Sequence, residues 1–180
     1  MSVTVDGENL TLEDVAKVAR KGERALLSPE AEERILRGQR AVERLVRSDR
    51  RVYGINTGFG SLARVRIGAE DLPALQENLI RSHAAGVGEP LPTEVVRGAM
   101  LLRANALAKG LSGAGLKTVR LLLDMLDRGV HPWMPSQGSV GASGDLAPLA
   151  HMTLVLMGEG WALSEDGCSR VPGEEALKRA

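Results

Sequence analysis

The pattern of hydrophobic and polar positions along this chain is mainly that of amphipathic helices. Apolar residues recur every three or four positions, which is typical of helices with one buried side. Ser, Thr, Pro and Gly stand where such stretches begin and end, as helix caps and breakers do. The pattern predicts helices at residues 11–21, 28–48, 70–85, 93–109, 112–128 and 146–157, and a last one opening at 172–175.

For three of these helices the sequence also predicts which sides are buried and which are exposed. Apolar residues cover most of the circumference of 93–109, which Thr93 is expected to cap, so that helix should pack on most sides. The helix at 146–157 has no charged residue and is expected to be wholly buried. The dense Arg and Glu surface of 28–48 is interpreted as a solvated face. Its inward positions are expected to be Ile35, Ala41, Val42, Leu45 and Val46.

Strand signals are few and short. Residues 3–5 predict a strand, 131–135 predict an extended path between two prolines, and 161–170 predict two strands around a turn at 165–167. The expected fold class is therefore mainly α: one helical domain, residues 1–180, with a few short strands. The last helix stops at Ala180 without a cap, which indicates a truncated sequence.

Two glycine-rich segments interrupt the helical pattern. Residues 53–60 hold three glycines in eight positions and are expected to form an irregular loop. The second segment, 138–145, lies between Val130 and Gly158, where Asp145 is the only formally charged side chain apart from histidines. Because burying an unpaired charge is costly, this stretch is expected to be buried or to face a closed, dry cavity.

Composition and charge exclude several classes of function. The 180 residues carry 23 basic and 23 acidic side chains, so nothing favours binding to nucleic acid or an anionic membrane. The longest uncharged hydrophobic run, 146–158, is too short to cross a bilayer, and the N-terminus does not have the pattern of a secretory signal. The single cysteine, Cys168, allows no internal disulfide, which favours a cytoplasmic location.

The common catalytic motifs do not fit the second glycine-rich segment. Residues 141–145 differ from a serine nucleophile elbow because Asp145 stands where that motif needs glycine. No Gly-Lys-Ser/Thr sequence occurs that could form a phosphate-binding loop. The three histidines have no metal-ligand spacing, so no metal is expected, and His131 and His151 are interpreted as structural.

Chemistry of the backbone itself remains possible at Ala142-Ser143-Gly144. In a tight turn the Gly144 nitrogen can attack the Ala142 carbonyl carbon and close a five-membered ring. Loss of water from that ring, and of water from Ser143, leaves an exocyclic methylene conjugated with the ring. The product is an electrophile made from the protein. The helix that follows would point its N-terminus at this group and stabilise negative charge there.

Three segments resemble the signatures of one family. GSVGASGDLAPLAHM, at 138–152, resembles the signature of the aromatic amino acid ammonia-lyases, whose Ala-Ser-Gly forms a 4-methylidene-imidazol-5-one (MIO) group. YGINTGFG at 53–60 and NLIRSHAAGVG at 78–88 resemble two further signatures. Within the last, Ser82-His83 resembles the selector pair of the histidine ammonia-lyases. The motifs run in order over the whole chain, which therefore resembles the N-terminal part of this family.

The resemblance implies a reaction and a set of roles. The reaction is elimination of ammonia from L-histidine to give urocanate, the first step of histidine degradation, with MIO from Ala142-Ser143-Gly144 and neither metal nor PLP. Tyr53 would remove the β-proton or work beside the base, and His83 would recognise or orient the substrate. The assisting positions implied by the same signatures are Ser82, Asn56, Gly60 and Asp145.

The resemblance also implies parts that would lie beyond residue 180, namely further substrate-binding groups and the long central helices of a homotetramer. Two interpretations stay open. The chain is the N-terminal piece of a working histidine ammonia-lyase, or it is a helical module that needs a separate C-terminal chain and catalyses nothing alone. Phenylalanine or tyrosine specificity and aminomutase activity also stay open. Without those long helices, the faces of 94–109 and 146–157 that would be buried against them are expected to be exposed, which favours association, aggregation or binding of a partner.

Overall fold

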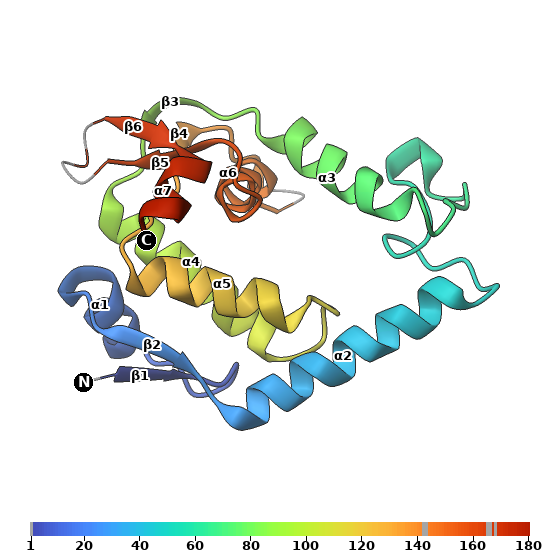
Figure 1. Cartoon of the computed structure of the whole chain (residues 1–180), viewed down its shortest axis with the longest axis horizontal. Coiled ribbons are helices and arrows are strands. Elements are labelled where there is room, and N and C mark those ends of the chain that lie inside the picture. The colour runs from blue at the N-terminus through green and yellow to red at the C-terminus, as the bar shows by residue number, and fades with distance from the viewer. Residues whose placement is uncertain (1, 142–143, 165–166, 168) are drawn as a thin grey trace.

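Helices dominate the structure, as the hydrophobic pattern predicts. The computed structural model describes residues 2–141, 144–164, 167 and 169–180. Helix α2 runs along one side of the molecule, α3 returns along the opposite side, and α4 and α5 lie between them (Figure 1). The helices are α1 (Leu12–Lys21), α2 (Pro29–Arg47), the short 3₁₀ helix η1 (Gly60–Leu62), α3 (Leu72–His83), α4 (Thr93–Ala108), α5 (Leu116–Asp127), α6 (Leu146–Leu156) and α7 (Gly173–Arg179). The mainly α fold class is confirmed.

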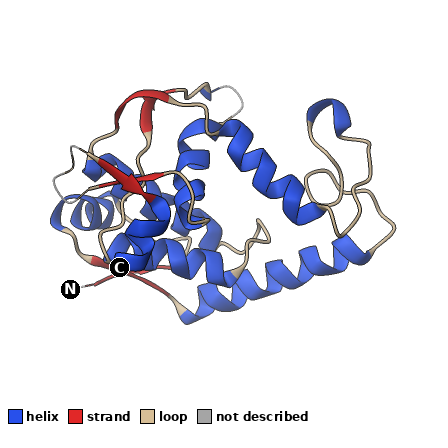
Figure 2. Cartoon of the chain, turned by 45° about the horizontal axis from the view of Figure 1, so that its top comes forward, coloured by secondary structure: helices blue, strands red, loops and turns tan. Residues whose placement is uncertain are grey.

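In the described part of the chain the strands form three two-stranded sheets (Figure 2). The strands are β1 (Ser2–Val5), β2 (Arg24–Leu27), β3 (Val87–Pro90), β4 (Pro135–Gln137), β5 (Trp161–Leu163) and β6 (Arg170–Pro172). β1 pairs with β2 in parallel across α1, whereas β3–β4 and β5–β6 are antiparallel. The predicted strands at 3–5 and 161–170 are confirmed. Two positions of the turn between the latter, 165 and 166, lie outside the described residues.

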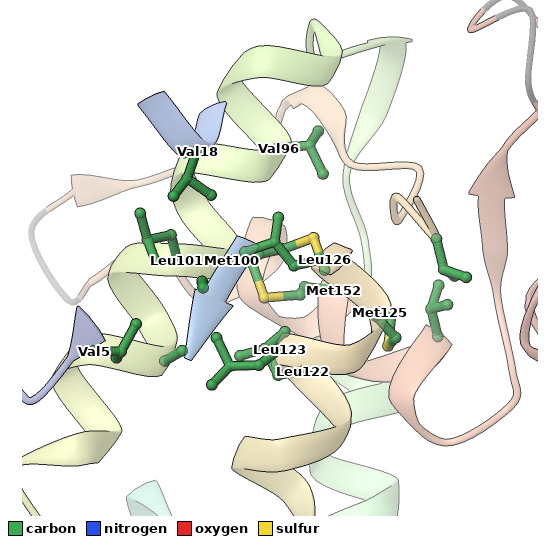
Figure 3. Packing of buried hydrophobic residues seen from close by; sticks show 14 of the residues in the cluster. Val5, Val18, Val96, Met100, Leu101, Leu122, Leu123, Met125, Leu126 and Met152 are labelled. Atoms are coloured by element: carbon green, nitrogen blue, oxygen red, sulfur yellow. The ribbon is translucent and has the colours of Figure 1, made fainter. Parts of the chain in front are cut away.

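The hydrophobic core forms where α4 packs against α1, α5 and the β1–β2 sheet. Residues from these distant segments meet side by side in Figure 3. The members labelled there are Val5, Val18, Val96, Met100, Leu101, Leu122, Leu123, Met125, Leu126 and Met152. Because α6 contributes Met152, the helix that follows the second glycine-rich segment is anchored in the core.

Helix α2 is less buried than its pattern predicts. Its first half packs into the structure through Ile35, which is 1% exposed, but the expected inward residues of its second half are only partly covered. That half extends beyond the core toward the loop at 48–70 (Figure 1). Amphipathic spacing shows which side of a helix is apolar, but not whether a partner covers it.

Three expectations about the helix ends and faces are wrong. α5 starts at Leu116 rather than 112, because Gly113 is left-handed with φ +68. Thr93 is the first residue of α4 rather than its cap, since Pro92 takes the N-cap position without a side-chain hydrogen bond. α6 is not wholly buried, because Leu146 is 47% exposed. No helix in the described residues is long and apolar enough to cross a membrane.

Candidate active site

An open groove of about 590 Å³ is lined mainly by three segments, and it brings together three of the predicted site residues, Tyr53, Gly60 and His83. One wall comes from the glycine-rich loop at 53–60, a second from the C-terminal part of α3, and a third from the first two turns of α6. Its lining residues are Tyr53, Phe59, Gly60, Leu79, Ile80, His83, Arg103, Leu146, Leu149, Ala150 and Thr153. The lining is largely apolar with a few polar groups, which is the composition of small-molecule sites.

The 53–60 loop is irregular, as predicted, and is built around Asn56. The Asn56 side chain is 1% exposed, and its oxygen accepts a hydrogen bond from the Val52 backbone N–H at 2.8 Å. Its amide group donates to the carbonyl oxygens of Arg50, at 2.8 Å, and Leu45, at 3.3 Å. Asn56 therefore ties the loop to the end of α2, and it is not among the residues that line the groove.

Tyr53 stands at the rim of the groove with 63% of its surface exposed. Its ring meets Phe59 edge to face, with ring centroids 5.8 Å apart and planes inclined by 73°. Such pairs have a preferred geometry, so Phe59 limits the orientation of the tyrosine ring. Gly60, φ +55, begins η1 just beyond this pair. Tyr53 thus presents its phenol from a loop that is fixed at both ends.

His83 is the last residue of α3 and lines the groove opposite the loop. Its Nδ1 lies 2.8 Å from the Leu79 carbonyl oxygen, which can only accept. In the neutral ring Nδ1 therefore carries the proton and Nε2 offers a lone pair. Ser82 is exposed, and its hydroxyl donates to the same carbonyl at 2.8 Å while lying 3.1 Å from His83 Nδ1. Ser82 and Leu79 thereby fix the ring and its tautomer.

The prediction that the second glycine-rich segment is buried is wrong for its described residues. The residues described between 136 and 146 are exposed, Asp145 among them. A run without charges shows that its side chains are small, apolar or uncharged, but not that other segments cover them. Ala142 and Ser143 lie outside the described residues. Gly144 has φ +94, a conformation that L side chains rarely adopt.

Asp145 forms the N-cap position of α6 without a side-chain cap hydrogen bond. Its carboxylate instead accepts a hydrogen bond from the Ser139 hydroxyl, across the glycine-rich segment. Both residues line a second hollow of about 470 Å³, which shares Arg103 and Leu149 with the groove. The N-terminal end of α6, at Leu146, therefore lies between the two hollows, with its positive dipole end toward the segment.

Arg103 is a lining residue that the sequence analysis did not single out. It projects from α4 and lines both hollows, and within the described residues it forms no ion pair. A signal for it existed in the sequence, because α4 is an apolar helix with only two arginines. The other, Arg97, is 9% exposed and donates to the backbone carbonyl oxygens of Val18 and Leu126.

The two histidines interpreted as structural line neither hollow. His131 Nε2 lies 3.0 Å from Arg97 Nη1, which donates to it. Burial, followed by the nearby guanidinium of Arg97, lowers the pKa of His131 to about 4. His151 Nε2 accepts a hydrogen bond from the Gly86 backbone N–H at 3.0 Å, and burial lowers its pKa. Both rings are therefore neutral acceptors at pH 7.

The sequence and the fold are those of a known class of proteins. Residues 10–180 match the family described as aromatic amino acid lyase, and the chain belongs to that family. The histidine ammonia-lyase of Caldanaerobacter subterraneus is 56% identical over 178 residues, which are 99% of this chain and 35% of that relative. The chain thus spans about a third of the length of the curated relatives it matches.

Solved structures show the same likeness. The histidine ammonia-lyase from Trypanosoma cruzi superposes with a TM-score of 0.89 at 39% identity, over 99% of this chain and 34% of that one. A tyrosine aminomutase from Streptomyces globisporus superposes with a TM-score of 0.91 at 32% identity, over 99% of this chain and 33% of that one. The fold is therefore shared by family members with different reactions.

Proposed function

We propose that this chain is the N-terminal part of a histidine ammonia-lyase, which eliminates ammonia from L-histidine to give urocanate. The observation that carries the proposal is the groove, where Tyr53 and His83 approach from separate elements beside the first residue of α6. The sequence identity of 56% to a relative named histidine ammonia-lyase supports the choice of substrate. We further propose that the complete enzyme is a cytoplasmic homotetramer.

The residues present fit the formation of an MIO group. Ala142-Ser143-Gly144 supplies a small residue, a hydroxyl that can be eliminated, and a glycine amide. A Cβ built at Gly144 would meet nothing within 4 Å, so no described residue beyond its chain neighbours packs on that side of the glycine. Once formed, the group would act as an electrophile toward the substrate and make ammonia easier to expel. The N-terminal end of α6 would stabilise negative charge next to it.

We propose a distinct task for each of the other site residues. The Tyr53 phenol, exposed at the rim, would remove the β-proton of the substrate or assist the group that does. His83 Nε2, held as an acceptor, would receive a hydrogen bond from an imidazole N–H of the substrate. Asn56 and Gly60 would shape the loop that carries Tyr53. Asp145 would assist ring closure from its place at the start of α6.

A chimaera tests the proposal. Residues 1–180 would replace the corresponding third of the Caldanaerobacter histidine ammonia-lyase, which supplies the remaining two thirds. We expect urocanate from L-histidine and an intact mass lower by two waters, with the mass loss abolished in Ser143→Ala. A folded chimaera with neither property would overturn the proposal. Release of a β-amino acid from tyrosine or phenylalanine would favour aminomutase activity instead.

The assembly-module interpretation is tested with the two parts as separate chains. The 180-residue chain and the C-terminal part of the same relative would be mixed and assayed for urocanate. The expected result is activity in the mixture and none in either part, because residues 1–180 contain only part of the groove's surroundings. No activity in a folded mixture, with an active chimaera, would show that the two parts must be one chain.

A further inference from the structure

We propose that His151 is a positioning residue, which fixes the spacing between His83 and the glycine-rich segment 138–145 by holding Gly86 in place. The inference rests on the proposed function and goes beyond the residues that line the groove. The key observation is a contact between α6 and the link that follows α3, which are far apart in sequence. His151, on α6, accepts a hydrogen bond from the backbone N–H of Gly86, three residues beyond the end of α3.

Gly86 sits in a slot that has no space for a side chain. A Cβ built on it would lie 3.1 Å from His151 Nε2 and 3.2 Å from both the Gln137 carbonyl oxygen and the Pro135 Cβ. These distances are shorter than nine in ten real contacts of a Cβ atom, so the neighbours of a methyl group there would have to move by a few tenths of an ångström. His151 and β4 therefore determine the path of the chain as it leaves His83.

The same glycine contacts the start of the second glycine-rich segment. Gly138 has φ +137, and a Cβ built on it would lie only 2.9 Å from the Gly86 Cα. The next residue after Gly86, Val87, pairs with Gln137 in the β3–β4 sheet. Gly86 is thus held between His83 on one side and the stem of the 138–145 segment on the other. If Gly86 moved, both His83 and the stem of the segment would shift with it.

The protonation state of His151 suits this role. Burial lowers the pKa of the ring, so the ring is neutral at pH 7 and Nε2 keeps the lone pair that Gly86 uses. His151 is only half-buried and does not line the groove, so its contribution to the reaction would be indirect. Removing the acceptor would leave a partly buried backbone N–H unpaired and free the segment to move.

The experiment compares three substitutions in the chimaera. His151→Leu keeps an apolar volume and removes the acceptor, and we expect KM for L-histidine to rise about tenfold while kcat changes less than about threefold. His151→Gln can place an amide oxygen near the position of Nε2, and we expect it to restore most of the KM. Gly86→Ala keeps the His151 acceptor, but the added methyl group would displace the His151 ring. We therefore expect this substitution to raise KM as His151→Leu does.

His131→Leu is the matched control. His131 Nε2 is also a neutral acceptor, but its donor is Arg97 and it lies outside the groove. The control should lose stability with an unchanged KM. An unchanged KM in folded His151→Leu, or equal KM values in His151→Leu and His151→Gln, would overturn the proposal. If His151→Leu does not fold, Gly86→Ala provides the test, and an unchanged KM in folded Gly86→Ala would overturn the proposal.

Hydrogen exchange separates this proposal from the proposed function. In the 180-residue chain the Gly86 amide should exchange about tenfold faster in His151→Leu than in the unsubstituted protein, and His151→Gln should restore protection. An inactive, undehydrated chimaera with these exchange rates would overturn the proposed function and leave the contact established. Equal exchange in all three proteins would overturn the role of His151.

Discussion

Tyr53 and Asn56 are three residues apart in one loop, yet they have different physical surroundings. Tyr53 is mostly exposed at the rim of the groove, where a substrate can reach its phenol. Asn56 is buried, and its three hydrogen bonds hold the backbone that presents Tyr53. At the scale of single residues, one side chain is therefore suited to chemistry and the other to holding the first in position.

Tyr53→Phe in the chimaera should lower kcat at least about 100-fold, as loss of a general base does. The ring that contacts Phe59 remains, so the loop should keep its conformation. Steady-state kinetics with L-histidine measure the effect, and an unchanged loss of two waters in the intact mass serves as the control. Retention of half the kcat would exclude Tyr53 from proton transfer.

Asn56→Ala in the 180-residue chain should lower the free energy of unfolding by about 2–3 kcal/mol, because the backbone groups of Val52, Arg50 and Leu45 lose their partner. Urea denaturation measures the change. The matched control is Asn78→Ala, since Asn78 is exposed on α3 and should cost less than about 0.5 kcal/mol. Equal effects of the two substitutions would contradict the role assigned to Asn56.

At the scale of elements, Arg97 joins several helices at one point in the core. From α4 its guanidinium donates to the last turn of α5 through Leu126, to α1 through Val18, and to His131 beyond α5. Burial lowers the pKa of Arg97, but the group stays charged, so this contact requires a neutral His131. Acid should therefore weaken the junction of these elements.

The chain should lose stability as pH falls from 6.5 toward 4. The pKa of His131 is lowered from 6.5 to about 4 in the folded chain, so between these values the unfolded state binds the proton more readily. His131 stabilises the fold fully above pH 6.5, and its contribution is lost as pH drops. With solvent screening of the partly exposed ring, we expect about 2 kcal/mol over this range.

The variant His131→Gln isolates this effect. It keeps an acceptor for Arg97 and removes the titrating ring, so its stability should fall less between pH 6.5 and 4 than that of the unsubstituted chain. Urea denaturation at a series of pH values measures both proteins. Parallel curves for the two proteins would show that other groups, such as His151, are responsible for the loss in acid.

At the scale of the whole molecule, the chain exposes apolar residues on helices that also form its core. Val95 and Leu102 are 45% and 52% exposed on α4, seven residues apart and therefore on one side of it. Leu146 is 47% exposed at the start of α6. The expectation that the faces of α4 and α6 would be left uncovered is confirmed at these positions, and such faces favour association.

The 180-residue chain should therefore associate in a concentration-dependent way, and Leu102→Glu should weaken that association at least about tenfold by placing a charge on the exposed apolar side of α4. Sedimentation velocity at several concentrations measures the change. Leu62→Glu introduces the same charge at a leucine that is also 52% exposed but lies on η1, and should have little effect. A monomeric unsubstituted chain would contradict the prediction.

Much of the fold could be predicted because its signals are local. The helices at 11–21 and 28–48 follow from apolar spacing and from caps such as Thr11 and Ser28, whose side chains accept the cap hydrogen bonds. Strand β2 was missed because its sequence, Arg-Ala-Leu-Leu, does not alternate between apolar and polar residues as Val3-Thr4-Val5 does. It exists because Ala25 is buried beside β1 and its backbone N–H donates to Asp127, 102 residues away.

The sequence by itself determined the helices, the irregular loop at 53–60 and the tripeptide Ala142-Ser143-Gly144, since each depends on neighbours within a few residues. Only the tertiary structure decided which candidates share a groove, that Asn56 is buried and does not line it, and that Arg103 lines it. It also decided that the described residues of the 138–145 segment are exposed and that His151 accepts a hydrogen bond from Gly86, 65 residues away. Burial and contact depend on how distant segments pack, which local periodicity does not encode.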